Sequence, residues 1–241
     1  MSHIWLGEFL GTCFLMLFGS GAVAGAVLKH SKAENGNWLT VSIGWGLAVM
    51  LGVFMAQSAG SPGADINPAV SLAKYWMGLY SGSTMLLLWT AQLSGAFLGS
   101  TLAYFAYGPH WSATHDPHLK LLVFSTSPAI RHYPSNLLIE IIGTAILVLG
   151  IGAIFGPATH AMPVVGLGPY LVGLLIIAIA ISLGGPTGYA INPARDLGPR
   201  IAHALLPIPG KGPSDWAYAW VPIVGPFIGA SLGAWIARLI F

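Results

Sequence analysis

The tripeptide Asn-Pro-Ala occurs twice in the chain, once in each half, and its residue types suit the start of a helix. An asparagine at the N-cap accepts hydrogen bonds from the backbone, and proline fits the first helical position because it has no N–H to leave unpaired. The stretches before the two copies, GSPGADI and GGPTGYAI, contain too much glycine and proline for a regular helix. Two helix starts are therefore predicted, at Asn67, Pro68 and Ala69 and at Asn192, Pro193 and Ala194.

The two asparagines could place amide donors at one point inside a membrane. If each side-chain oxygen caps its own helix, the NH2 group of that asparagine is left free to donate. Two half-helices that enter from opposite faces would meet N-terminus to N-terminus, with two positive dipole ends on the same spot. A water molecule there would turn its oxygen toward both amides and could not relay a proton. The expected result is a path that is permeable to neutral solutes and excludes ions and protons.

The composition requires a membrane around these segments. Hydrophobic residues make up 55% of the 241 residues and charged residues only 7%, with a mean hydropathy of +0.76. A soluble protein of this size could not cover its surface with so few charges, whereas a lipid-facing surface needs none. The net charge of +2 is too small to indicate nucleic acid as a partner. The single Cys13 excludes an internal disulfide, and no metal site or cofactor is expected.

Six stretches are long and apolar enough to cross a bilayer, and they form two similar halves. A spanning helix needs about 20 mostly apolar residues, so the Asn-Pro-Ala segments, 67–77 and 192–205, are too short to span. Glu8 and Glu140 each stand three residues before a Gly-Thr pair at the start of a half. Three spans per half is an odd number, so the second half must be inverted relative to the first. The expected spans are 4–28, 39–60, 83–107, 136–156, 164–184 and 217–240.

These motifs resemble the major intrinsic protein family, the aquaporins and glycerol facilitators, over essentially the whole chain. The resemblance rests on both Asn-Pro-Ala boxes, the Glu-x-x-Gly-Thr at the start of each half, and Arg195 after the second box. It implies an all-α membrane protein with six transmembrane helices plus two re-entrant half-helices, in one channel domain over residues 1–241. The inverted three-span repeats cover roughly 1–108 and 135–241. A homotetramer in the lipid bilayer is also implied, multi-pass in a bacterial cytoplasmic (plasma) membrane.

The resemblance further implies a solute constriction and favours the glycerol-conducting branch. Asp196 directly after Arg195, and Pro222-Ile223 in the last span, are similar to the glycerol facilitators. Arg195 and backbone carbonyls could pair with the hydroxyl groups of a polyol, while aromatic rings face its hydrocarbon edge. A small residue where strict water channels place histidine would widen the pore. The constriction that the resemblance implies consists of Trp45, Ala180, Tyr189 and Arg195.

Three acidic residues near the path need a separate interpretation. Glu8 and Glu140 could accept hydrogen bonds from backbone N–H groups of the loops before the two Asn-Pro-Ala segments, and this structural role is favoured over direct solute contact. Asp65 stands where the family usually has histidine. Its carboxylate could admit more polar or partly cationic solutes, or respond to pH if burial disfavours its ionisation. Alternatively, it pairs with a basic group such as Lys74 or faces solvent.

The sequence therefore predicts a passive channel that excludes protons and ions, and not an enzyme. Its expected solutes are glycerol and water, with urea, hydrogen peroxide and small undissociated acids as further candidates. A water-selective aquaporin is one alternative, and a secondary transporter that uses Glu8 and Glu140 for coupling is another. The sequence contains no H-E-x-x-H or G-x-S-x-G motif that would indicate catalysis. The histidines of 108–135 are expected to lie in an ordinary polar loop rather than in a metal site.

Overall fold

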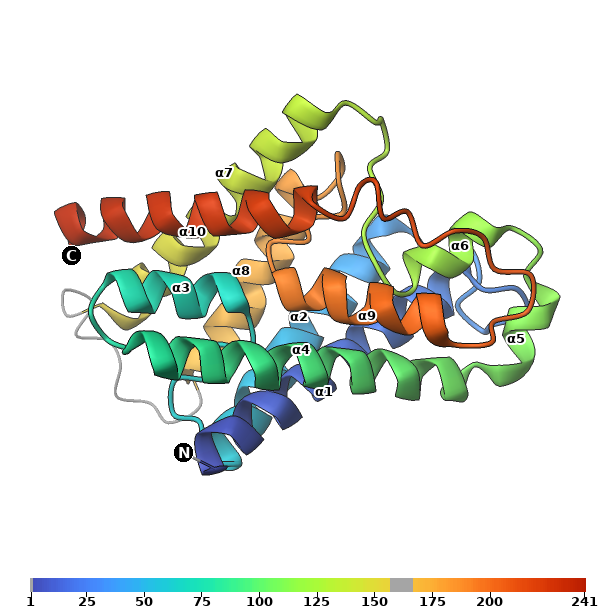
Figure 1. Ribbon diagram of the computed structural model, residues 1–241. Helices are drawn as coiled ribbons and strands as arrows, with labels where there is room; N and C mark the ends of the chain where they lie inside the picture. The colour runs from blue at the N-terminus through green and yellow to red at the C-terminus, as the bar shows by residue number, and fades with distance from the viewer. Residues whose placement is uncertain (1, 157–166) are drawn as a thin grey trace.

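The computed structural model describes residues 2–156 and 167–241, which form helices joined by loops (Figure 1). Five of the described helices, α1, α2, α4, α7 and α10, have the length and hydropathy of membrane spans. The sixth expected span is the apolar helix α8, of which 17 residues are described; its expected first residues, 164–166, lie outside the described part. The helices are α1 (Ser2–Val27), α2 (Trp38–Ser58), α3 (Pro68–Trp76), α4 (Gly82–Ala106), α5 (Gly108–Ala113), α6 (Pro117–Leu122), α7 (Tyr133–Phe155), α8 (Leu167–Leu183), α9 (Pro193–Leu205) and α10 (Val221–Ile240).

Two helices are too short to cross a membrane, and both begin at the Asn-Pro-Ala segments. Helix α3 has 9 residues and α9 has 13, which at a rise of 1.5 Å per residue correspond to about 14 and 20 Å. Figure 1 shows α3 and α9 lying nearly end to end through the middle of the molecule, with their first residues toward each other. The two half-helices thus meet N-terminus to N-terminus, as predicted for half-helices that enter the membrane from opposite faces.

The long helices pack in the same way in both halves. Helix α1 packs on α2 and α4, and helix α7 packs on α8 and α10. Each half-helix lies mainly against the last span of the other half, α3 on α10 and α9 on α4, which interlocks the two repeats. Glycines permit the closest approaches: a Cβ at Gly95 would lie 2.2 Å from the carbonyl oxygen of Phe9, and one at Gly229 would lie 2.3 Å from that of Ile141.

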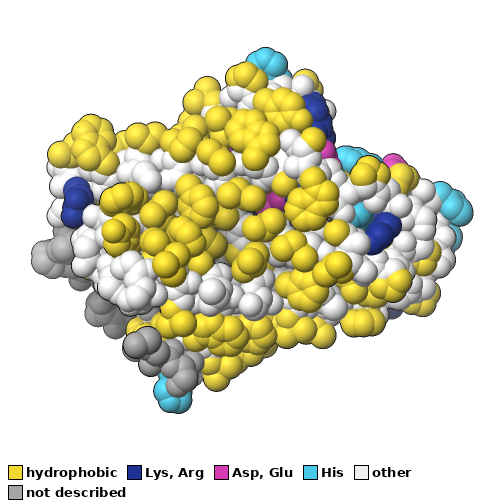
Figure 2. All heavy atoms as spheres, viewed as in Figure 1, with side chains coloured by type: hydrophobic (Ala, Val, Ile, Leu, Met, Phe, Trp, Pro, Cys, Tyr) yellow, Lys and Arg dark blue, Asp and Glu magenta, His cyan; other side chains and the backbone are white. Residues whose placement is uncertain are grey.

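Large hydrophobic side chains cover the outside of the helix bundle. Figure 2 shows them across most of the face formed by α3, α4, α9 and α10. A soluble domain would expose such a surface to water at high cost, whereas lipid accepts it. Examples with at least half of their surface exposed are Leu86 and Phe105 on α4, Leu138 on α7, Ile181 on α8 and Trp235 on α10.

The segment 108–135 is more ordered and more buried than the polar loop that the sequence predicted. It contains the short helices α5 and α6, and its residues Trp111, Lys120 and Phe124 are almost completely buried. The Lys120 ammonium donates to the carbonyl oxygen of Pro209, and the Phe124 ring packs 5.7 Å from the Trp111 ring. These partners lie far away along the chain or belong to the segment itself, so local polarity gave no sign of this burial.

Candidate functional site

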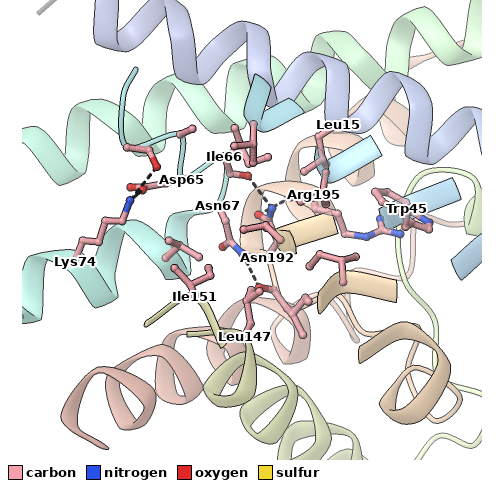
Figure 3. Close-up of a pocket in the computed structure, with 18 of the residues that line it drawn as sticks. Leu15, Trp45, Asp65, Ile66, Asn67, Lys74, Leu147, Ile151, Asn192 and Arg195 are labelled. Atoms are coloured by element: carbon pink, nitrogen blue, oxygen red, sulfur yellow. Dashed lines mark hydrogen bonds and ion pairs between the residues drawn. The ribbon is translucent and has the colours of Figure 1, made fainter. Parts of the chain in front are cut away.

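A cavity of about 280 Å³ extends between the two halves and passes the point where the half-helices meet. Figure 3 shows Lys74 on one side of the two asparagines, and Arg195 with Trp45 on the other side. Much of the wall is apolar, and α1, α2, α7 and α8 contribute to it. The predicted site residues that line it are Trp45, Asp65, Asn67, Tyr189, Asn192 and Arg195.

Each half-helix begins at an asparagine whose side chain caps it. Asn67 Oδ1 accepts a hydrogen bond from Ala69 N at 2.9 Å, and Asn192 Oδ1 accepts one from Ala194 N at 3.0 Å. In both helices proline occupies the first helical position, where its missing N–H leaves nothing unpaired. Both asparagines have an extended backbone, which turns the chain from the preceding loop into the helix.

The amide groups of the same asparagines tie the two halves together. Asn67 Nδ2 donates to the carbonyl oxygen of Ile191 at 2.8 Å, and Asn192 Nδ2 donates to that of Ile66 at 2.8 Å (Figure 3). The sequence predicted that each NH2 group would be free, whereas one of its two N–H groups is used in this crossed pair. An amide NH2 carries two hydrogens, so one N–H per asparagine remains for a solute in the cavity that both side chains line.

The loops before the half-helices hold four non-glycine residues in a left-handed backbone. The angle φ is 42° at Ala64, 46° at Ile66, 41° at Tyr189 and 42° at Ile191. These positions are three and one before the capping asparagine in each half, so both loops make the same turn. Residues with a Cβ rarely adopt this backbone, which costs of the order of 1–3 kcal/mol each. The surrounding structure must therefore hold both loops in place.

Glu8 and Glu140 supply that support in equivalent ways. Both carboxylates are buried, and neither lines the cavity. Each accepts two backbone N–H bonds from the residues directly before the asparagine and one bond from a hydroxyl group of the same loop. The geometry matches the structural role that the sequence favoured over contact with solute. The donors, at 2.7–3.0 Å, are Ser61 Oγ, Asp65 N and Ile66 N for Glu8, and Thr187 Oγ1, Ala190 N and Ile191 N for Glu140.

Arg195 lies across the indole ring of Trp45 at one end of the cavity. Its Cζ atom is 3.9 Å from the ring centroid, and Nη1 donates to the carbonyl oxygen of Phe124 at 3.3 Å. Trp45 lies against Gly19, where an added Cβ would come within 2.3 Å of the ring. A guanidinium carries five N–H donors, and among the described residues only Phe124 accepts a side-chain bond from Arg195. Its other donors remain for oxygen atoms of a solute.

Tyr189 completes this end of the cavity, whereas Ala180 does not line it. The Tyr189 ring meets the Trp38 ring edge-on at 5.8 Å, and its buried hydroxyl has no hydrogen-bond partner among the described residues. Ala180 has no exposed surface, and its carbonyl oxygen accepts a bond from Trp38 Nε1 at 3.0 Å. Of the four residues predicted for the constriction, the structure places Trp45, Tyr189 and Arg195 in the wall and Ala180 outside it.

Asp196 and Arg200 anchor the segment that carries the Phe124 carbonyl group. Asp196 Oδ1 accepts from Arg200 Nε at 2.8 Å, and Oδ2 accepts from Thr126 N at 2.8 Å and from Thr126 Oγ1 at 2.7 Å. Arg200 Nη2 donates back to the carbonyl oxygen of Thr126 at 3.0 Å. Sequence reasoning singled out Asp196 and missed its partners Arg200 and Thr126, as well as Phe124. The one available signal was the cost of two charges in an apolar segment, which requires polar partners.

Asp65 pairs with Lys74, which is one of the alternatives that the sequence left open. The Asp65 side chain has no exposed surface, and its carboxylate contacts the Lys74 ammonium and accepts a hydrogen bond from Ser71 Oγ at 2.7 Å. A paired carboxylate without exposed surface is not available as a ligand for a cationic solute. Asp65 and Lys74 both belong to the wall of the cavity, and of the two Lys74 is the one with exposed surface at this end.

Within residues 2–156 and 167–241, no group of three or more His, Cys, Asp and Glu side chains could hold a metal ion. Two histidines of the segment 108–135 have other hydrogen-bond partners. His110 Nδ1 lies 2.8 Å from the carbonyl oxygen of Lys29, and His132 Nδ1 lies 2.8 Å from Ser135 Oγ. The first contact joins the segment to the loop after α1, and the second lies within the segment.

Comparison with known proteins supports, over the full length of the chain, the family that the sequence motifs resemble. The chain is 50% identical over 238 residues to the probable glycerol uptake facilitator protein of Thermotoga maritima, with 99% of each chain covered. It is 52% identical to glycerol uptake facilitator protein 3 of Lactiplantibacillus plantarum, with 95% of this chain and 93% of the relative covered. Its fold matches the crystal structure of the aquaglyceroporin from Plasmodium falciparum with a TM-score of 0.87 and 30% identity, covering 99% and 96% of the two chains.

The sequence model of the family described as "Major intrinsic protein" matches residues 2–237. The match includes both capped half-helices, both supporting glutamates and the Trp45–Arg195 pair. This is a family of channels and not of enzymes, and its multi-pass helical fold is the one described above. The chain belongs to the major intrinsic protein family.

Proposed function

We propose that this protein is a passive channel that conducts glycerol, other small neutral solutes and water, and that excludes protons and ions. The observation that carries the proposal is the meeting of two asparagine amides in a cavity that reaches from Lys74 to Arg195. The names of the relatives in Thermotoga maritima and Lactiplantibacillus plantarum, both glycerol uptake facilitators, support glycerol as the solute.

A polyol suits the chemistry at the Arg195 end of the cavity. Its hydroxyl oxygens can accept bonds from the unoccupied N–H groups of Arg195, and its carbon atoms can lie against the rings of Trp45 and Tyr189. Farther along, the remaining amide N–H groups of Asn67 and Asn192 supply the next donors. A neutral molecule with a hydroxylated edge and a hydrocarbon edge can therefore exchange its water shell for successive contacts along the cavity. No single contact then binds it so tightly that it stops moving.

The same groups oppose the passage of charge. Arg195 is a fixed positive charge beside the path, and the N-termini of α3 and α9 add two positive dipole ends at the asparagines. A water molecule that accepts from both amides points its own hydrogens away from them on either side. The hydrogen bonds of a file of water molecules therefore reverse their orientation at this point, so protons cannot be transferred along the file.

Passive conduction fits the described carboxylates better than coupled transport does. A coupling site requires a carboxylate that can bind and release an ion beside the path. Glu8 accepts four side-chain or backbone hydrogen bonds, Glu140 accepts three, and neither lines the cavity. Asp65 is paired with Lys74. These carboxylates are occupied in holding the structure.

The proposal includes the assembly and location expected of such a channel. We take residues 1–241 as one channel domain, with a pore in each protomer of a homotetramer in a bacterial cytoplasmic membrane. The exposed hydrophobic faces of the spanning helices support contacts with lipid and with neighbouring protomers. Crosslinking of the purified protein in lipid nanodiscs, read out as the largest crosslinked species, tests the tetramer.

The direct test is stopped-flow light scattering of proteoliposomes exposed to an inward glycerol gradient. We expect fast shrinkage as water leaves, followed by fast reswelling as glycerol and water enter. Shrinkage without reswelling would leave a water-selective aquaporin and contradict the glycerol proposal. Reswelling that accelerates when a proton gradient is imposed would contradict passive conduction.

Replacing Ala180 with histidine is expected to lower glycerol flux at least about tenfold while water flux persists. Ala180 has no exposed surface, and Trp38 Nε1 donates to its carbonyl oxygen, so a bulky ring there must displace its neighbours or enter the cavity. Tyr189→Phe serves as the matched control, because it removes a hydroxyl without a partner among the described residues and should leave glycerol flux unchanged. Wild-type glycerol flux in Ala180→His would contradict this prediction.

A further inference from the structure

A cluster of polar groups marks the end of the cavity opposite Arg195. We call it the Lys74 cluster; it consists of Gly63, Asp65, Ser71, Lys74 and Tyr80. The Lys74 ammonium contacts Asp65 Oδ1 and donates to the carbonyl oxygen of Gly63 at 3.0 Å. Asp65 Oδ2 accepts from Ser71 Oγ at 2.7 Å, and the Tyr80 hydroxyl lies 3.4 Å from Asp65 Oδ1. Figure 3 shows Lys74 and Asp65 pointing toward each other beside the loop.

The second repeat has no equivalent of this cluster. Counting from the capping asparagines, the position of Asp65 is occupied by Ala190 and that of Lys74 by Pro199. Within residues 184–205 the charges instead begin three residues after the asparagine, with Arg195. The two ends of the cavity therefore each present one basic side chain, supplied by different positions of the repeat.

Within the cluster, Asp65 and Lys74 have different access to the cavity. The Asp65 side chain has no exposed surface, and its oxygens are engaged by Lys74, Ser71 and Tyr80. The Lys74 side chain is 20% exposed and lines the cavity. An ammonium has three N–H donors, and Asp65 and Gly63 accept two of them. One donor of Lys74 is therefore left for an acceptor in the cavity.

The spacing along α3 places this donor on the path. Asn67, Val70 and Lys74 are separated by three and four residues, so they follow one face of the helix, and all three line the cavity. Apolar side chains line the cavity around them, among them Val53 and Ile151. The Lys74 end thus presents a fixed cationic donor with hydrocarbon nearby, which is the same combination that Arg195 and Trp45 form at the other end.

We propose that Lys74 is a second solute-contacting residue, which donates a hydrogen bond to a hydroxyl oxygen of the polyol as it enters or leaves the pore, and that Asp65 is the positioning residue for its ammonium. This proposal rests on the proposed glycerol conduction. An unpinned lysine would spread over many rotamers, whereas the ion pair with Asp65 holds the donor beside the path and reduces the entropy lost on contact. Water is smaller and forms its own file, so it depends less on this donor.

The test uses Asp65→Asn/Lys74→Met, which removes both charges and leaves no unpaired carboxylate in the wall. In proteoliposomes we expect the ratio of glycerol to water permeability to fall about threefold to tenfold, the weight of one hydrogen bond, with water permeability unchanged. Lys32→Met, an exposed lysine that does not line the cavity, is the matched control and should keep the wild-type ratio. An unchanged ratio in a double variant with wild-type water permeability would overturn the proposal.

A chemical rescue separates loss of the ammonium from a change of fold. In a Cys13→Ala background, Lys74→Cys should show the lowered ratio, and alkylation of its thiolate by 2-bromoethylamine, with loss of bromide, rebuilds a side chain of lysine length and charge. We expect alkylation to restore the ratio, while the Cys13→Ala protein treated in the same way stays unchanged. Failure of a quantitatively alkylated protein to recover would contradict the role of the ammonium. Absence of glycerol flux in the wild type would instead contradict the proposed function itself.

Discussion

The glycerol flux of a Glu140→Gln variant is expected to be at least about tenfold lower than that of the wild type, and the variant is expected to unfold at a lower temperature. The carboxylate of Glu140 accepts bonds from the backbone N–H groups of Ala190 and Ile191 and from the Thr187 hydroxyl. A glutamine amide offers one oxygen acceptor and turns an NH2 donor toward a donor of the loop. An unsatisfied buried N–H costs about 1–3 kcal/mol, and more where its partner was charged.

The backbone of this loop makes the loss larger than one hydrogen bond. Tyr189 and Ile191 both have positive φ, and the strain of each, of the order of 1–3 kcal/mol, is held only while Glu140 binds the loop. Relaxation of this turn would withdraw the Ile191 carbonyl from Asn67 Nδ2 and move the Tyr189 ring. The substitution would therefore disturb both the asparagine pair and the Arg195 end of the cavity.

The measurement is glycerol and water flux in proteoliposomes, with thermal unfolding followed by intrinsic fluorescence. Glu34→Gln makes the same chemical change at a partly exposed residue that accepts bonds from Lys29 and His30, and it should alter neither flux nor unfolding. Glu140→Asp keeps the charge but is one methylene shorter, so an intermediate loss is expected. Glu140→Gln with wild-type flux and stability would show that the loop does not depend on this carboxylate.

Much of the architecture could be predicted because it depends on local chemistry. The half-helices were expected over 67–77 and 192–205 and occupy Pro68–Trp76 and Pro193–Leu205. Their starts are set by asparagine caps and by proline at the first helical position, which are visible in three consecutive letters. The long spans are likewise set by length and hydropathy alone.

The contacts that complete the site could not be predicted, because they join residues far apart in the chain. The bond from Asn67 Nδ2 to Ile191 spans 124 positions, and that from Thr126 to Asp196 spans 70. Nothing in the polar composition of the segment 108–135 indicates that the Phe124 carbonyl would reach Arg195. Sequence reasoning identified both charged partners but had no means to find the backbone groups that they bind.

Ala180 illustrates a different limit. Its position was matched to the family by sequence, and this match was taken to mean that its side chain lies in the constriction. The position was expected in the constriction because a larger residue there would narrow the pore. In this chain the residue has no exposed surface, and only its carbonyl oxygen takes part, by accepting from Trp38. A small side chain acts by what it leaves open, and that cannot be assigned from its own contacts. Trp38 Nε1 donates to this carbonyl oxygen and the Trp38 ring meets that of Tyr189, and both contacts join residues far apart in the chain.

Replacing Arg195 with valine is expected to make the channel leak cations, including protons, at least about tenfold faster than the wild type, and to lower glycerol flux because the donors to the polyol hydroxyl groups are lost. Among the described residues, the Arg195 guanidinium forms no hydrogen bond with a carboxylate, since Asp196 binds Arg200 and Thr126. Two unit charges 4 Å apart repel by about 4 kcal/mol at an effective dielectric constant of 20. Removing that repulsion alone would raise cation entry about a thousandfold.

The observed leak should be smaller than this, because the two half-helix N-termini and the asparagine amides remain. Proton entry can be followed with a pH-sensitive dye trapped in proteoliposomes, and glycerol flux measured on the same preparation. Arg238→Val, at the end of α10 and outside the cavity, is the matched control and should stay tight. If Arg195→Val is as tight as the wild type while it conducts glycerol, the asparagine pair is by itself sufficient to exclude charge. Arg195 would then serve solute recognition alone, and its stacking on Trp45 would matter for glycerol and not for cations.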